Sequence, residues 1–334
     1  MKSVSMKDMA EALNLSKTTV SWILAGAGKE RGFCEETIRR VQDYAKKINY
    51  QPNLLARSLS TGTTNTIGLI IPFIGDTFYA QIAQHIEKEA QLSLYNLTIC
   101  SSEGNSEHEI KQIRMLRSKQ VDGLIIAPTK DSLPEIKRLK QDNFPFVLID
   151  RYFPEVETNY IIVNNEESCY QLVTHLIRKK RRRIAILVSD PQLFVMQLRI
   201  NGYRQALKDA NIPFNDRLYI HIPRSSYKKS IVELLDSLFL NVPDVDAFFF
   251  ANHYLALETL SYFIKRKIDY LNLYGLACFH ETQALDILAP QMSISQMPIE
   301  QIGQKAVGLL VEGIKLKTNS CKSLILENSF FEYD

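Results

Sequence analysis

The pattern of apolar and polar positions changes at about residue 60. Before that point, apolar residues recur three and four positions apart, as at Met6, Met9, Ala10 and Leu13, which predicts short amphipathic helices. From Thr66 onward, short apolar runs alternate with longer amphipathic stretches. Strands that alternate with helices predict a parallel sheet covered by helices on both faces.

The spacing of apolar residues and the capping residues in 1–60 predict three helices. Ser5 and Asp8 form a capping pair at the start of the first helix, and Ser16 caps a second helix over 17–24. A third amphipathic helix follows over 35–48. Two short helices with a tight turn between them, followed by a third, predict a helix-turn-helix unit whose second helix can read DNA.

The remaining chain repeats the alternation of strand and helix twice, which predicts two doubly wound subdomains. Open parallel sheets bind ligands beyond the carboxyl ends of their strands, so a small-molecule site is expected there. Polar and aromatic residues cluster at these positions, which suits a hydroxylated ligand: Phe73, Asp76, Phe78 and Tyr79 after the first strand, Asp150 and Arg151, Arg199 near a helix start, Asn252 and His253, and His280 and Glu281.

Charge is distributed unevenly along the chain. Residues 1–60 hold ten Lys or Arg against six Asp or Glu, a balance of +4, whereas the whole chain carries +3. A basic segment attached to a near-neutral remainder is compatible with nucleic-acid binding.

Several classes of protein find no support in the sequence. The five cysteines are odd in number and lack C-x-x-C spacing, so we expect neither a disulfide framework nor a metal site. The histidines lie singly, and we see no phosphate loop or hydrolase motif, so we expect no enzyme and no cofactor. Without a signal segment or a long apolar run, we expect a cytoplasmic protein with no membrane partner.

Three segments of residues 1–60 carry a family resemblance: 6–10, 15–21 and 50–59. Together with 121–125, 199–203, 251–252 and 296–298, they resemble the lac repressor and purine repressor family over nearly the whole chain. The resemblance implies a transcription regulator, expected to be a repressor, that acts as a homodimer on a pseudo-palindromic operator in double-stranded DNA.

The resemblance also implies the domain organisation of an α/β protein. Residues 1–60 form the helix-turn-helix DNA-binding domain with a hinge helix over 53–59, and residues 66–334 form a periplasmic-binding-protein-like core that binds the effector. We place the first subdomain of this core at about 66–160 and 291–322. The second is then expected at about 161–290 and 323–334.

Residues for DNA binding follow from the same resemblance. Lys17, Thr18 and Trp22 are implied to face base edges, Thr19 and Ser21 to hold phosphates, and Leu59 to wedge into the minor groove near Arg57. The full expected set is Ser5, Ser16, Lys17, Thr18, Thr19, Ser21, Trp22, Asn53, Arg57 and Leu59. Trp22 replaces the commoner basic residue, and packing of its ring on the rest of the protein is the alternative.

For the effector, the resemblance implies contacts from Phe78, Asp150, Arg199 and Asn252. His280 stands where the family usually has an aspartate, which argues against a simple neutral-sugar assignment. Arg151, Arg199 and His280 near one cleft favour an anionic effector such as a sugar acid or sugar phosphate. Two alternatives remain: a regulator of the same fold that responds to a partner protein, and a sugar-binding protein that does not bind DNA.

Overall fold

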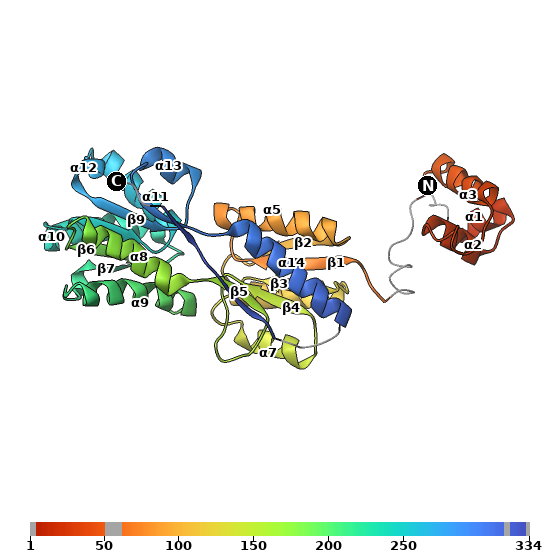
Figure 1. Cartoon of the computed structure of the whole chain (residues 1–334), viewed down its shortest axis with the longest axis horizontal. Helices are drawn as coiled ribbons and strands as arrows, with labels where there is room; N and C mark the ends of the chain where they lie inside the picture. Colours follow the sequence, from red (N-terminus) through yellow and green to blue (C-terminus); the bar gives the residue numbers. More distant parts are fainter. Residues whose placement is uncertain (1–4, 51–61, 317–320, 332–334) are drawn as a thin grey trace. The chain divides into compact units, whose positions relative to one another are not determined.

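The computed structural model describes residues 5–50, 62–316 and 321–331 and divides into two units, Met1–Thr64 and Asn65–Asp334. We call the first unit the head and the second the body (Figure 1). The hinge predicted over 53–59, with Asn53, Arg57 and Leu59, lies outside the described residues. Among the helices that are described, none is both long and apolar enough to cross a membrane.

The head contains three helices, α1 (Met6–Leu13), α2 (Lys17–Leu24) and α3 (Glu35–Lys47). The predicted caps are confirmed: Ser5 and Asp8 form a reciprocal capping box, and the hydroxyl of Ser16 accepts a hydrogen bond of 2.9 Å from the amide of Thr19. One small apolar cluster joins the helices, formed by Met9, Ala10, Leu13, Val20, Ile23 and Val41.

The body contains two six-stranded sheets, each covered by helices (Figure 1). In the first sheet all neighbouring strands are parallel, in the order β11-β5-β4-β3-β1-β2. Its strands are β1 (Thr66–Ile71), β2 (Asn96–Ser101), β3 (Gly123–Ile126), β4 (Phe146–Ile149), β5 (Tyr160–Val163) and β11 (Ser323–Leu326). Its helices are α5 (Thr77–Leu92), α6 (Ser106–Ser118), α7 (Leu133–Gln141) and α14 (Ile299–Leu316).

The second sheet has the order β12-β10-β9-β8-β6-β7, parallel except for the pair of β10 and β12. Its strands are β6 (Ile184–Val188), β7 (Tyr219–His221), β8 (Ala247–Phe250), β9 (Gly275–Phe279), β10 (Ser293–Gln296) and β12 (Ser329–Phe331). Its helices are α8 (Asn165–Arg178), α9 (Phe194–Asp209), the short 3-10 helix η1 (Asp216–Leu218), α10 (Tyr227–Asn241), α11 (His253–Lys265), α12 (Tyr270–Leu273) and α13 (Gln283–Leu288).

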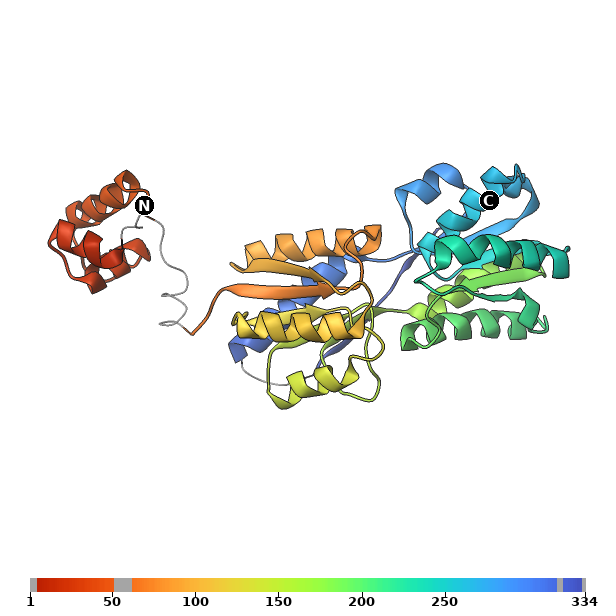
Figure 2. The same cartoon turned by 180° about the vertical axis from the view of Figure 1, so that it is seen from behind.

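The apolar runs of the central strands form these sheets because helices cover both faces. Successive side chains of a strand point to opposite faces: Leu69 packs in the cluster with α5 and α14, whereas Ile70 packs in the cluster with α6 and α7. Figures 1 and 2 show α14 and α6 on opposite sides of the first sheet. The two-sided burial explains why these strands lack the alternation of half-exposed strands.

The chain passes between the two sheets three times within the described ranges: between β5 and α8, between β10 and α14, and between β11 and β12. The strand pairing corrects the predicted subdomain boundaries. β5 and β11 belong to the first sheet, and β10 belongs to the second. The error arose because short apolar strands look alike in sequence, and only pairing with β5 or β9 decides which sheet each one joins.

Candidate functional site

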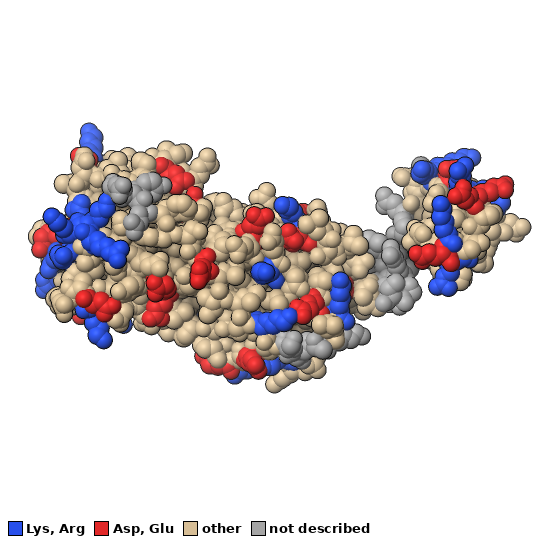
Figure 3. Space-filling model, viewed as in Figure 1, with Lys and Arg blue, Asp and Glu red and all other residues tan. Residues whose placement is uncertain are grey.

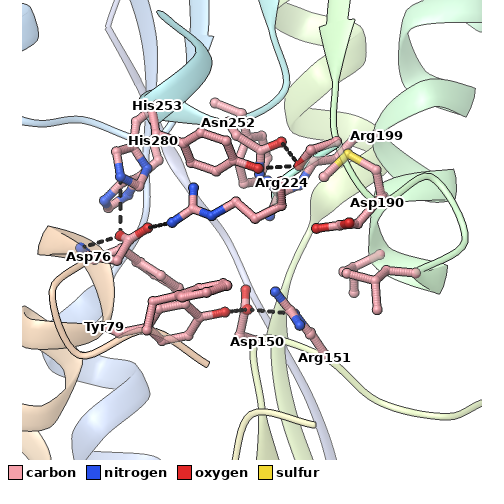
Figure 4. Close-up of a pocket in the computed structure, with 18 of the residues that line it drawn as sticks. Asp76, Tyr79, Asp150, Arg151, Asp190, Arg199, Arg224, Asn252, His253 and His280 are labelled. Carbon is pink, nitrogen blue, oxygen red and sulfur yellow. Dashed lines mark hydrogen bonds and ion pairs between the residues drawn. The ribbon is translucent and has the colours of Figure 1, made fainter. Parts of the chain in front are cut away.

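One pocket of the body gathers all nine residues predicted to contact an effector (Figure 4). Its lining comes from the carboxyl ends of strands in both sheets, as expected for open parallel sheets. The predicted residues in the lining are Phe73, Asp76, Phe78, Tyr79, Asp150, Arg151, Arg199, Asn252 and His280. Further lining residues include Ser189, Asp190, Met196, Arg224, His253, Tyr254, Phe279 and Met297.

Asp76 links the two halves of this pocket. It caps α5 beside the first sheet and accepts a hydrogen bond of 3.1 Å from the amide of Phe78. Its carboxylate lies 2.9 Å from the guanidinium of Arg224 and 3.2 Å from Nε2 of His253, both carried by the second half (Figure 4). Burial would raise the pKa of Asp76, but the hydrogen bond and charge of His253 and the charge of Arg224 lower it to about 2.

Arg224 is surrounded by aromatic rings as well as by Asp76. Its guanidinium carbon lies 3.6 Å from the ring centre of Tyr254, 4.5 Å from that of Phe73 and 5.3 Å from that of Tyr227. Cation–π attraction of this kind strengthens when the pair is shielded from water, and only 15% of the Arg224 side chain is exposed. The three rings and Asp76 therefore hold the Arg224 side chain within the pocket lining.

A second polar group lies at the end of β4. The hydroxyl of Tyr79 donates a hydrogen bond of 2.7 Å to Asp150, and Nε of Arg151 lies 3.4 Å from the same carboxylate (Figure 4). Burial raises the pKa of Tyr79 well above its usual value, so the phenol stays protonated and remains a donor. Arg151 and Asp150 thus neutralise each other within the pocket wall.

Arg199 lies deeper and supports the wall. It donates hydrogen bonds of 2.8 Å to the side chain of Asn165 and 2.7 Å to the carbonyl of Ala251, and its guanidinium stacks on Phe279 at 3.6 Å. Burial lowers the pKa of this guanidinium. Because Nε and Nη1 already donate to protein acceptors, Arg199 joins α9 to α8 and to the end of β8.

His280 offers polar atoms that the protein itself does not use. The residue is 4% exposed and packs against Phe78 and His253, and neither of its ring nitrogens has a hydrogen-bond partner among the described residues. Burial, together with the charge of His253, lowers its pKa to about 3, so the ring is neutral near pH 7. A neutral imidazole has one donor and one acceptor, which is the complement of a hydroxyl group.

The pocket is nearly neutral and small in this conformation. Three guanidinium groups, from Arg151, Arg199 and Arg224, stand against three carboxylates, from Asp76, Asp150 and Asp190. About 60 Å³ of free volume remains among the side chains. That volume holds a few waters, whereas small-molecule pockets usually measure about 300–1,000 Å³.

The head presents most of its predicted DNA-binding residues on α2. Lys17, Thr18 and Trp22 are exposed, Thr19 and Ser21 are half-buried, and Ser5 and Ser16 are exposed at the starts of α1 and α2. On the side drawn in Figure 3, Lys and Arg side chains of the head lie among Asp and Glu side chains. That side of the head is therefore not uniformly basic.

Comparison with known proteins identifies the family. A family model described as periplasmic binding proteins and sugar binding domain of the LacI family matches residues 64–333. The chain belongs to the LacI family. The similarity to a curated relative extends beyond the body: the HTH-type transcriptional repressor PurR of Aliivibrio fischeri is 28% identical over 317 residues, which cover 94% of this chain and 92% of PurR.

Solved structures of LacI-type regulators have the same fold. The lac repressor dimer bound to operator and an anti-inducer matches with a TM-score of 0.85 and 20% identity, over 99% of this chain and 98% of that chain. The regulator CelR in complex with cellobiose matches with a TM-score of 0.72 and 22% identity, over 98% of both chains. The predicted fold class, a helix-turn-helix unit followed by a periplasmic-binding-protein-like body, is confirmed.

Sequence reasoning missed several lining residues in this LacI-family pocket. Ser189 and Asp190 directly follow β6, so the rule that singled out the other strand ends would have found them. Arg224 follows β7, an edge strand of three residues whose end is hard to locate from sequence. Tyr254 was missed because an aromatic residue in a helix ordinarily signals packing.

Proposed function

We propose that this LacI-family protein is a repressor that binds a pseudo-palindromic operator as a homodimer and is released when its body binds a neutral, polyhydroxylated effector such as a sugar. Family membership makes it a DNA-binding transcription regulator controlled by a small effector. Acting on an operator requires the protein to be in the cytoplasm with the DNA, and we assign it no catalytic role.

The pairing of charges in the pocket supports a neutral effector. Arg151 and Arg224 each contact a carboxylate, and Arg199 is held by protein acceptors. An anionic ligand would find Nη1 of Arg224 without a hydrogen-bond partner among the described residues, but elsewhere it would have to compete with these partners and would lie near three carboxylates. The acidic effector expected from Arg151, Arg199 and His280 is therefore less suited to the pocket than a neutral sugar, and the cellobiose complex of CelR is a precedent within the fold.

The unpartnered nitrogens of His280 give the proposal its most specific support. Buried polar atoms normally have partners, so an imidazole that is 4% exposed with none is suited to receive a ligand hydroxyl. One nitrogen accepts and the other donates, as a sugar hydroxyl can also do.

Control of DNA binding follows from the closed state of the pocket. We expect an effector larger than about 60 Å³ to move Asp76 away from Arg224 and His253 when it enters. Asp76 belongs to the first half of the body and the other two residues to the second, so ligand entry changes how the halves are held together. We expect this movement to be coupled to operator affinity by about 1–3 kcal/mol.

Calorimetric titration with neutral sugars, sugar acids and sugar phosphates tests the effector class, with His280→Phe as the matched variant. The native protein should bind a neutral sugar, and His280→Phe should bind it at least about 10-fold more weakly, as expected when a buried hydrogen bond to ligand is lost. Its thermal stability should be preserved, because the lost nitrogens have no protein partner.

Binding confined to acidic sugars would overturn the neutral assignment. Binding of a neutral sugar that is unchanged in His280→Phe would remove His280 from the site. If none of the compounds binds and operator release requires an added polypeptide, the body responds to a partner protein instead.

A further inference from the structure

Trp22 lies on the exposed side of α2, but one face of its ring is not open to a ligand. The guanidinium carbon of Arg31 lies 4.7 Å from the centre of the indole, within the range of cation–π attraction. Phe33 flanks the same ring at 6.2 Å. The indole is 37% exposed, so it is neither part of the buried cluster of the head nor freely projecting.

The loop after α2 produces this stack by folding back on the helix. Gly26 and Gly32 adopt positive φ angles of 82° and 76°, a conformation that favours glycine. The amide of Ala27 donates to the carbonyl of Trp22 at 3.0 Å, and the amide of Phe33 donates to the carbonyl of Gly28 at 3.0 Å. These backbone bonds hold the segment that carries Arg31 beside the last turn of α2.

Arg31 differs from the neighbouring basic residues in its partners. Lys29 and Arg39 both lie within 4 Å of the carboxylate of Glu35, at 3.2 and 3.8 Å. Arg31 makes no ion pair among the described residues. Its five N–H donors and its full charge are therefore available beside Trp22, which lies one helical turn after Thr18 in α2.

We propose that Arg31 contacts the operator and that Trp22 is the positioning residue that holds it there. This inference rests on the proposed DNA binding of the head and adds a contact residue outside the recognition helix. An indole has a single donor, whereas a guanidinium matches paired acceptors, as on the edge of guanine or on a phosphate. The stack limits the rotamers of a long side chain, which reduces the entropy lost when the contact forms.

The probe is a DNA duplex that the full-length native protein selects from a randomised pool. On the enriched duplex, Arg31→Ala should bind about 10- to 100-fold more weakly, the range of one good arginine contact. Arg39→Ala removes the same charge from a residue already paired with Glu35 and should change affinity by less than about 3-fold. Equal losses for the two variants would overturn the proposal.

The two possible acceptors give different signatures. If Arg31 reads a guanine, Arg31→Ala should lose discrimination at one base pair of the enriched sequence. If it holds a phosphate, discrimination should remain and the slope of log affinity against log salt should fall by about 1. Either result supports a contact between Arg31 and the operator. If Arg31→Ala changes neither the base discrimination nor the salt dependence, no such contact exists.

A double-mutant cycle tests the positioning role of Trp22. Trp22→Ala should weaken binding nearly as much as Arg31→Ala, the double variant should be little weaker than either, and Trp22→Phe, which keeps a ring face, should be intermediate. A loss in Trp22→Ala with none in Arg31→Ala would show that the indole itself contacts DNA and would overturn the proposal.

Fluorescence supplies a reading that does not depend on DNA. Trp22 is the only tryptophan of the chain, so emission reports on this stack alone. Arg31→Ala should shift the emission of the free protein to longer wavelength, and Arg39→Ala should not. Failure of the native protein to enrich any duplex would contradict DNA binding by the head, whereas enrichment of the same duplex with equal affinity by Arg31→Ala contradicts only the role of Arg31.

Discussion

The exposed side of α2 and the pocket of the body both carry arginine on aromatic rings, but they hold it in opposite ways. Arg31 stacks on Trp22 with no ion pair among the described residues, whereas Arg224 is enclosed by three rings and paired with Asp76. The first arginine has no ionic partner to give up, and salt screening weakens its attraction to DNA. The second keeps Asp76 on Nη2 while Nη1 has no hydrogen-bond partner among the described residues, so a ligand that displaces Asp76 gains only the difference between two sets of contacts.

The largest expected effect tests whether the enclosed arginine really differs from an exposed one. Arg224→Ala should lower the free energy of unfolding by about 2–3 kcal/mol, because it leaves the carboxylate of Asp76 buried with only His253 and the amide of Phe78 as partners. Arg266→Ala is the matched control. Arg266 pairs with Asp236 and lies 5.5 Å from the ring of Tyr262, but both charged side chains are about half exposed.

The control should lose less than about 1 kcal/mol, as exposed ion pairs do. Urea denaturation followed by circular dichroism measures both changes. Comparable losses in the two variants would mean that the buried pair of Arg224 and Asp76 stabilises the protein no more than the exposed pair of Arg266 and Asp236.

A somewhat smaller effect is expected from pH, and it concerns the pocket but not the head. His280 has a pKa of about 3 in the folded protein against 6.5 for a free side chain. Between these values the unfolded chain binds a proton that the folded chain does not, so stability falls as pH decreases below about 6.5. The loss approaches about 1.4 kcal/mol for each pH unit in that window.

The difference in stability between the native protein and His280→Phe isolates this contribution from other titrating groups. In urea denaturation from pH 7 to pH 5, the native protein should lose stability relative to His280→Phe as the pH falls. A difference that is constant with pH would contradict the buried, neutral state of His280.

The smallest effect should be confined to the head. Ser16→Ala removes the hydroxyl that accepts from the amide of Thr19 and should destabilise the head by about 1 kcal/mol. Trp22 fluorescence follows the head alone, since the chain has no other tryptophan. Thr282→Ala, which removes the cap of α13 in the body, should leave the fluorescence transition unchanged and so serves as the control.

Most of the fold was predictable because its signals are local. Caps such as Ser16 and runs such as Phe248–Phe250 mark their elements without knowledge of the rest of the chain. Most of the nine pocket residues follow strand ends, and the carboxyl ends of parallel strands meet at one edge, so position along the chain predicts proximity. Arg199, which lies inside α9, was expected from the family resemblance.

What the sequence did not reveal depends on contacts between distant segments. Arg224 and Asp76 are separated by 148 positions, and nothing local in either residue predicts their pairing. The same holds for the assignment of β10 and β11 to their sheets. The charge balance of the pocket also emerges only in three dimensions, which is why Arg151, Arg199 and His280 pointed to an anionic ligand in the sequence.

The three passages of the chain between the two sheets have a consequence for how such a protein can be recombined. The head is separated from the body by one boundary in the chain, so a single junction is enough to attach a different head to this body. Neither half of the body is continuous, because each sheet is completed by strands from the C-terminal part of the chain. Exchanging half of the pocket with that of a relative would need several matched junctions. Recombination between related genes can therefore change the DNA target more easily than the ligand.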